Sequence, residues 1–130
     1  MKLISAFFIL LFSIETQEPP KEIYGKWQLV KIEVNQETKV PDEERYFLRI
    51  TEDVIYYNLE VNNCERRGFS LNNNRIKLGS GGCTKICCDG SVDLISNFIN
   101  YEGEYELKQN QLIITTDSSK IFLERYNMVK

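Results

Sequence analysis

The stretch YEGEYELKQNQLIITTDSSKIFLERY, residues Tyr101 to Tyr126, carries the hydrophobic pattern that decides the fold. From Tyr101 to Lys108, apolar or small residues alternate with charged ones, which is the period of a half-buried β-strand. The β-branched run at 112–116 predicts a second strand, and residues 120–126 predict a third. Asn, Asp and Ser residues, which favour turns, separate these segments. The stretch therefore predicts an antiparallel meander of three strands.

The same period recurs upstream. Residues 24–34 predict a long strand, and its apolar set changes face near Leu29 and Val30, so we expect a bulge there. Further segments are predicted to form two hairpins and a flexible Gly-Ser-Gly-Gly loop. These are residues 45–50 with 54–61 for the first hairpin, 69–71 with 75–78 for the second, and 79–82 for the loop.

One segment departs from the strand period. Residues 89–100 carry apolar side chains at spacings of three and four, which predicts a short amphipathic helix near residues 90–99. Ser91 or Asp89 is the expected N-cap. About eight strands and one late helix predict a mainly β fold, a small antiparallel barrel that is closed or partly open.

Residues 1–17 have the features of an export signal. Lys2 precedes a nearly apolar run from Leu3 to Ile14, which is shorter than the roughly 20 residues that a membrane-spanning helix needs. We expect cleavage between Ser13 and Gln17, and a short uncleaved anchor is the alternative. The remaining chain is long enough for one domain. The sequence thus predicts a secreted or periplasmic protein with no membrane span after cleavage.

The composition narrows the classes of function. The net charge is −3 and the Lys and Arg residues are scattered, so we expect no nucleic-acid binding. The chain has no histidine, which excludes Ser-His and Cys-His nucleophilic catalysis and a His-ligated zinc. Carboxylate pairs for acid–base chemistry remain open. We expect a monomeric, non-enzymatic protein with no cofactor and no metal.

Four cysteines, Cys64, Cys83, Cys87 and Cys88, are the next candidates for a specific role. An even number of cysteines in an exported domain favours disulfides. A zinc site of four thiolates and a redox-active dithiol are the alternatives, but the spacing lacks the usual paired knuckles and the Cys-x-x-Cys motif. Cys87 and Cys88 point to opposite faces of an extended chain and should not share a partner. Three connectivities stay open.

The order of several motifs resembles that of the META/HslJ-like domain family across residues 22–128. The matching segments are Gly25–Val30 (GKWQLV), Asn63-Cys64, Phe69–Gly79 (FSLNNNRIKLG) and Thr84–Cys88 (TKICC), followed by the helix and the meander. The resemblance implies an extracytoplasmic, lipocalin-like barrel with no established general activity. It also matches the positions of Cys64 and Cys88, which implies a Cys64–Cys88 bridge and leaves Cys83–Cys87 as the second.

The segment Gly25-Lys26-Trp27 also resembles the Gly-x-Trp opening of lipocalins. In that family an arginine of the last strand packs over the tryptophan and closes the barrel. The resemblance implies that Arg125 makes this contact with Trp27. The alternative is that Trp27 is simply a core residue.

Tyrosines and glutamates form two further candidate surfaces. Tyr56 and Tyr105 are candidates for facing a ligand, because a tyrosine ring is apolar and its hydroxyl forms hydrogen bonds; cross-strand packing is the alternative. Glu102, Glu104 and Glu106 share one strand face and could bind calcium. Their spacing of about 7 Å along a strand favours a solvated outer face instead.

From these features we expect a secreted, non-enzymatic binding or envelope-associated META/HslJ-like module, whose partner is a protein or a small apolar ligand. A lipocalin-like carrier of a small hydrophobic ligand is the alternative, and an inhibitor acting through loops 35–44 or 79–82 is a third. A packed interior favours the module, whereas an open cavity favours the carrier. The residues expected to fill the interior are Trp27, Leu29, Leu48, Ile76, Phe98, Leu112 and Leu123.

Overall fold

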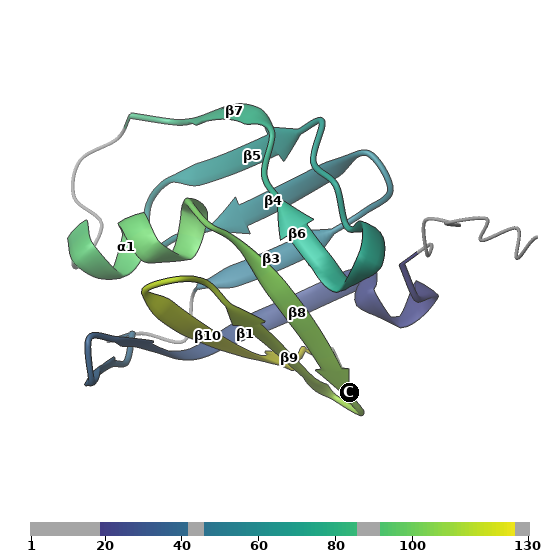
Figure 1. Cartoon of the computed structure of the whole chain (residues 1–130). Helices are drawn as coiled ribbons and strands as arrows, with labels where there is room; N and C mark the ends of the chain where they lie inside the picture. The colour runs from purple at the N-terminus through teal and green to yellow at the C-terminus, as the bar shows by residue number, and fades with distance from the viewer. Residues whose placement is uncertain (1–18, 42–45, 86–91, 127–130) are drawn as a thin grey trace, which may run out of the picture.

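A computed structural model describes residues 19–41, 46–85 and 92–126. All strands in these ranges belong to one antiparallel sheet, which curls around a single core (Figure 1). The strands are β1 (Gly25–Val34), β2 (Glu37–Lys39), β3 (Phe47–Ile50), β4 (Val54–Asn58), β5 (Asn63–Arg67), β6 (Arg75–Lys77), β7 (Ser80–Cys83), β8 (Glu102–Lys108), β9 (Gln111–Thr115) and β10 (Ser119–Arg125). The helices are the 3-10 turns η1 (Lys21–Ile23) and η2 (Asn72–Asn74) and the α-helix α1 (Val92–Ile99). The predicted mainly β fold is confirmed.

The sheet is a half-barrel with two edges. Its strand order is β6-β8-β9-β10-β1-β3-β4-β5-β7, and β2 pairs separately with β1. The edge strands β6 and β7 follow each other along the chain but are not paired with each other. The sequence predicted a barrel that is either closed or partly open, and the structure shows the partly open form. In Figure 1, α1 lies at one end of this half-barrel and η1 at the other.

The expected bulge in β1 is confirmed. Leu29 pairs with Leu123 of β10, but the next register pair joins Lys31 to Phe122, so Val30 is an extra residue. The extra residue shifts by one position the alternation of inward-facing and outward-facing side chains along β1. Trp27 and Leu29 before the bulge and Ile32 after it are consequently all buried.

The meander and the helix also form where the sequence predicted them. β8, β9 and β10 pair in order, and α1 buries Leu94 and Phe98 against the sheet. The two candidate N-cap residues, Asp89 and Ser91, lie outside the described residues.

The prediction of a flexible loop at residues 79–82 is wrong, because Ser80–Cys83 forms β7 and pairs with β5. Gly79 and Gly81 allow the backbone of this segment to lie close to the backbone of residues 65–68. A Cβ atom on Gly81 would lie 1.8 Å from the Glu65 carbonyl oxygen, so only glycine allows this pairing. Strand β5 itself was not predicted, since Cys64 is its one buried apolar residue.

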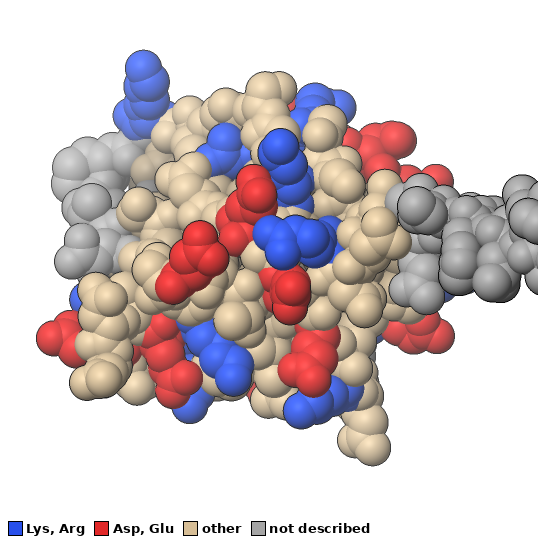
Figure 2. Space-filling view, in the orientation of Figure 1, with Lys and Arg blue, Asp and Glu red and all other residues tan. Residues whose placement is uncertain are grey.

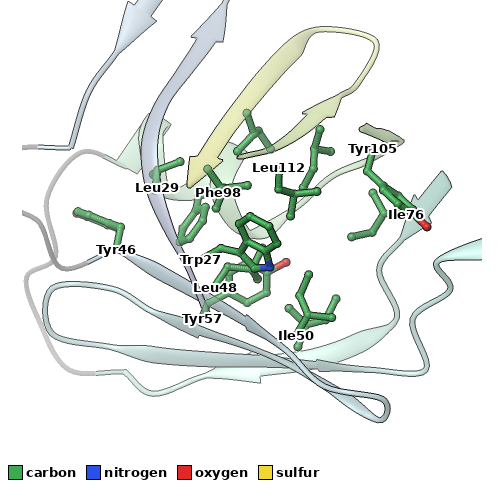
Figure 3. Close-up of a cluster of buried hydrophobic side chains, with 14 of the residues drawn as sticks. Trp27, Leu29, Tyr46, Leu48, Ile50, Tyr57, Ile76, Phe98, Tyr105 and Leu112 are labelled. Carbon is green, nitrogen blue, oxygen red and sulfur yellow. The ribbon is translucent and has the colours of Figure 1, made fainter. Parts of the chain in front are cut away.

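The interior of the half-barrel is packed with large side chains (Figure 3). All seven residues expected to fill it are buried and belong to one cluster. Tyr46 and Tyr57 are also buried there, and the ring of Phe98 makes edge-on contacts with both, with centroid distances of 6.2 and 5.2 Å. This packing leaves the large apolar side chains in contact with one another and away from solvent.

The predicted export signal, residues 1–17, lies outside the described residues. Within the described part, no helix combines the length and the apolar character that crossing a membrane requires.

Candidate functional site

Trp27 and Arg125 close the η1 end of the half-barrel. The Trp27 side chain is fully buried, and its indole N–H donates to the Ile23 carbonyl of η1 at 2.9 Å. The guanidinium carbon of Arg125 lies 4.0 Å from the centroid of the Trp27 ring. Arg125 also donates to the carbonyl oxygens of Tyr24, at 2.8 Å, and Glu22. The contact expected from the lipocalin resemblance is therefore present, and it ties the last strand to the segment before β1.

Gly25 makes room for this arginine. Its φ of 126° lies in a region that residues with a Cβ rarely adopt, and a Cβ there would lie 2.7 Å from Nη1 of Arg125. The Gly-x-Trp pattern thus has a local physical reason. The glycine allows the arginine to reach the ring that lies two residues further along the strand.

A hydrogen-bonded tyrosine pair, the buried Tyr57 and the half-buried Tyr101, lies among the aromatic side chains near α1. The Tyr57 hydroxyl donates to the Tyr101 hydroxyl at 2.8 Å, and their rings meet edge-on. Arg66 approaches the same region and donates to the carbonyl oxygen of Ile99 at 3.0 Å and to the Asn100 side chain. The Nε of Arg66 is buried and has no hydrogen-bond partner among the described residues.

Burial raises the pKa of both hydroxyls above the ordinary tyrosine value. For Tyr57, proximity to Tyr101 raises the pKa further, whereas the charge of Arg66 opposes the shift. For Tyr101, the hydrogen bond from Tyr57 and the charge of Arg66 both partly offset the effect of burial. The pair therefore stays protonated at neutral pH and makes a hydrogen-bonded contact beside the core.

Tyr105 lies beside a cleft at the η1 end. Its hydroxyl donates to the Leu71 carbonyl at 2.9 Å, and its side chain is buried. The cleft has a volume of about 520 Å³ and is bordered by Pro20, Asn74 and Leu107. The Tyr105 ring thus lies between the packed interior and this open cleft. One side of the ring contacts the core, and the other side borders the cleft.

The structure joins Cys64 to Cys83, so the Cys64–Cys88 bridge and the companion Cys83–Cys87 bridge implied by the family resemblance are wrong. The two residues are register partners in β5 and β7, with Cα atoms 4.0 Å apart. The Thr84 N–H donates to the Asn63 carbonyl on the adjacent pair. The cysteines therefore occupy a non-hydrogen-bonded position, where opposite side chains lie closest. Cys87 and Cys88 are outside the described residues.

Tyr56 faces outward and does not line the interior. Arg49 of β3 lies over its ring, with the guanidinium carbon 4.8 Å from the centroid. The side chain separates two adjoining hollows on the outer face of the sheet, of about 360 and 490 Å³, which both also border Asn63. We call the two hollows together the outer groove. Its remaining polar side chains are Lys26, Asn58, Glu65 and Thr84.

Charged side chains of both signs are interspersed over the surface that Figure 2 shows. Glu104 faces Arg75 at 3.6 Å and Glu106 faces Lys108 at 3.7 Å, so these outward glutamates have cationic neighbours. Within residues 19–41, 46–85 and 92–126, no group of three or more His, Cys, Asp or Glu side chains could hold a metal ion. The glutamates of β8 are thus part of a solvated, charge-paired outer face.

Four residues other than the cysteines were predicted to close the barrel or to face a ligand, and the structure places them in different parts of the fold. Trp27 and Arg125 are in contact, whereas Tyr56 and Tyr105 lie in separate hollows. Sequence reasoning missed Lys26, Arg49 and the amides of the outer groove. Each occupies an outward position of a different strand, so only the register of the sheet reveals that they are neighbours.

Comparison with known proteins gives a likeness of fold. No family model matches the chain, and no curated protein matches its sequence. A crystal structure of an uncharacterized protein from Bacteroides eggerthii DSM 20697 superposes with a TM-score of 0.51 and 14% sequence identity. The match covers 79% of this chain and 98% of the other. This chain is similar in fold to that uncharacterized protein, and the META/HslJ-like resemblance stays a prediction.

Proposed function

We propose that this chain is an exported, non-enzymatic binding or envelope-associated module of the META/HslJ-like kind, and that it binds its partner on the outside of the barrel. The packed interior carries this proposal. Trp27, Phe98 and Leu112 are each fully buried in one core cluster together with the other side chains expected to fill the barrel. A ligand inside the barrel would have to displace them, at a cost that rises with the apolar area disturbed.

Two observations support export. The Cys64–Cys83 disulfide suits an oxidising compartment, where such bonds form and persist. Residues 1–17 carry the pattern of a signal peptide. Both favour a secreted or periplasmic location over the cytosol.

The alternative is a carrier of a small hydrophobic ligand. The cleft beside Tyr105 favours it, because a volume of about 520 Å³ lies within the range of small-molecule sites. The Trp27–Arg125 contact also matches the lipocalin expectation. The cleft opens at the outer end of the core, however, and holds a ligand only at the surface.

Native mass spectrometry after incubation with mixed fatty acids tests the proposal against this alternative. We expect the spectrum to show only the mass of the protein without bound lipid. The variant Leu112→Ala is a matched control, since it opens an apolar cavity that should take up benzene, as detected by NMR line shifts. Fatty acid bound to the unaltered protein would contradict the proposal and favour the carrier.

Export is tested separately by producing the full chain in a bacterium that has a periplasm. We expect a periplasmic product that has lost its first residues, with the cut between Ser13 and Gln17. An uncut chain retained in the cytosol would contradict this part of the proposal.

A further inference from the structure

Two cations lie directly opposite each other on the outer face of the sheet. Lys26 of β1 is the register partner of Arg49 of β3, and both side chains point outward because their neighbours Trp27 and Leu48 are buried. Like charges at opposite positions of neighbouring strands destabilise a sheet. Among the described residues, no carboxylate lies within salt-bridge distance of either cation, which is also true of the exposed Lys77 and Lys120, whereas four other outward cations have such partners. Those pairs are Lys31–Glu33, Arg67–Glu65, Arg75–Glu104 and Lys108–Glu106.

Aromatic rings hold the two cations in place. The Lys26 ammonium lies 4.2 Å from the ring centroid of Phe47 and 4.7 Å from that of Tyr126. Arg49 lies over Tyr56 at 4.8 Å. Each contact attracts a cation to a ring face without neutralising its charge. The cations are thus ordered before any ligand arrives, which lowers the entropic cost of binding an anion between them.

The outer groove begins at this pair and continues across β3, β4, β5 and β7. Tyr56 stands between its two hollows, and Gly82 at the far side adds no side chain to block it. On the floor, the Asn58 side-chain N–H donates to the Asn63 side-chain oxygen at 2.9 Å. One such bond leaves further donors and acceptors on both amides. The groove therefore combines positive charge at Lys26 and Arg49, an aromatic surface and neutral hydrogen-bonding groups, and its one carboxylate, Glu65, is paired with Arg67 at 3.4 Å.

We propose that the outer groove binds an acidic saccharide. Its carboxylate or sulfate group lies between Lys26 and Arg49, the apolar face of a sugar ring packs on Tyr56, and its hydroxyls exchange hydrogen bonds with Asn58 and Asn63. This inference rests on the proposed function and deepens it by naming a ligand class. An acidic peptide fits less well, because β3, β4 and β5, which carry most of the groove, are hydrogen-bonded on both sides; a backbone ladder could form only at the free edge of β7.

The test is a calorimetric and NMR titration with a short oligogalacturonate and, in a second arm, a chondroitin sulfate oligosaccharide. The two arms distinguish carboxylate from sulfate. We expect saturable binding of at least one, with shifts at the Asn58 and Asn63 side-chain amides. The double variant Lys26→Gln/Arg49→Gln should bind about tenfold more weakly or worse, since two charge-assisted contacts are lost. Tyr56→Leu should also weaken binding about tenfold.

The matched control is Lys120→Gln, which removes one outward positive charge that lies over Phe122 rather than in the groove. We expect its affinity to stay within about twofold, and circular dichroism shows whether each variant is folded. A neutral maltooligosaccharide of equal length should bind at least about tenfold more weakly.

Several outcomes overturn the inference. These are no binding of either acidic saccharide, equal binding by the double variant, and equal binding of polyglutamate, which would make the groove a simple charge patch. If one of these outcomes is found and the barrel carries no lipid, the acidic saccharide is ruled out, but the proposal that another ligand binds on the outer surface remains. A lipid-loaded barrel would instead overturn the proposed function, whatever the saccharides do.

Discussion

The guanidinium of Arg125, in the last strand, lies 4.0 Å above the ring of Trp27, in the first. The same guanidinium donates to the Tyr24 carbonyl, so one side chain fixes both the ring and the segment that leads into β1. The contact therefore fastens together the two ends of the described chain at the bottom of the core.

Replacing Arg125 by methionine should keep the apolar stem and remove the hydrogen bonds and the charge. We expect a loss of about 1.5–3 kcal/mol in the free energy of unfolding, because hydrogen bonds from a charged donor to backbone carbonyls are lost. Urea titration followed by Trp27 fluorescence measures it. The control Lys120→Met, on the outer face, should change stability by less than about 0.5 kcal/mol. Equal effects of the two variants would show that the Trp27 contact contributes nothing.

Peptide mapping without reductant should find Cys64 joined to Cys83. The double variant Cys64→Ser/Cys83→Ser should lose about 2–4 kcal/mol, since the bridge closes a loop with a sequence separation of 19. Cys88→Ser should leave the Cys64–Cys83 peptide unchanged. A peptide linking Cys64 to Cys88 would contradict the structure and restore the pairing that the family resemblance implies.

Two adjacent glycines of β7 should respond differently to alanine. A Cβ on Gly81 would overlap the Glu65 carbonyl, whereas a Cβ on Gly82 would meet nothing within 4 Å. We expect Gly81→Ala to cost about 1–3 kcal/mol and Gly82→Ala to be neutral within about 0.5 kcal/mol. Thermal unfolding of the oxidised proteins measures both. If the two variants have the same unfolding temperature, β7 does not approach β5 as closely as described.

Stability should fall at alkaline pH. Because burial raises the folded-state pKa of Tyr57 and Tyr101 above the unfolded value, their contribution is complete below about pH 10 and is lost as the pH rises further. Urea midpoints at pH 8 and pH 11 measure the decline.

The variant Tyr101→Phe should be less stable than the unaltered protein at pH 8, by about 1 kcal/mol, because Tyr57 loses its acceptor. It should nevertheless show a smaller further loss at pH 11. Tyr56→Phe keeps the buried pair and should retain the full decline. A Tyr101→Phe protein whose alkaline decline matches that of the unaltered protein would refute this origin of the pH dependence.

The local pattern was enough to predict the meander, the helix and the bulge in β1, since each depends on which face of a short segment is apolar. It was not enough for β7. The glycine at position 81 is required by a carbonyl oxygen of another strand, and the same residue type also marks flexible loops. Cys83 lies in β7, so its pairing with Cys64 could not be predicted without that strand.

The candidate site was harder to foresee than the fold. The Trp27–Arg125 contact could be predicted, because a known family pattern contains both residues. The outer groove has no such motif. Lys26, Arg49 and Asn58 come from three strands, and each looks like an ordinary solvated residue until the sheet register places it beside the others.

The pairing of β1 with β10 also affects when the protein acquires its shape. Because β10 is the last strand of the described chain, β1 can pair with β2 and β3 early in synthesis but with β10 only late. Until β10 has been made, Trp27 lacks its contact with Arg125. In the exported module proposed above, this pairing would leave one side of β1 open until late in synthesis.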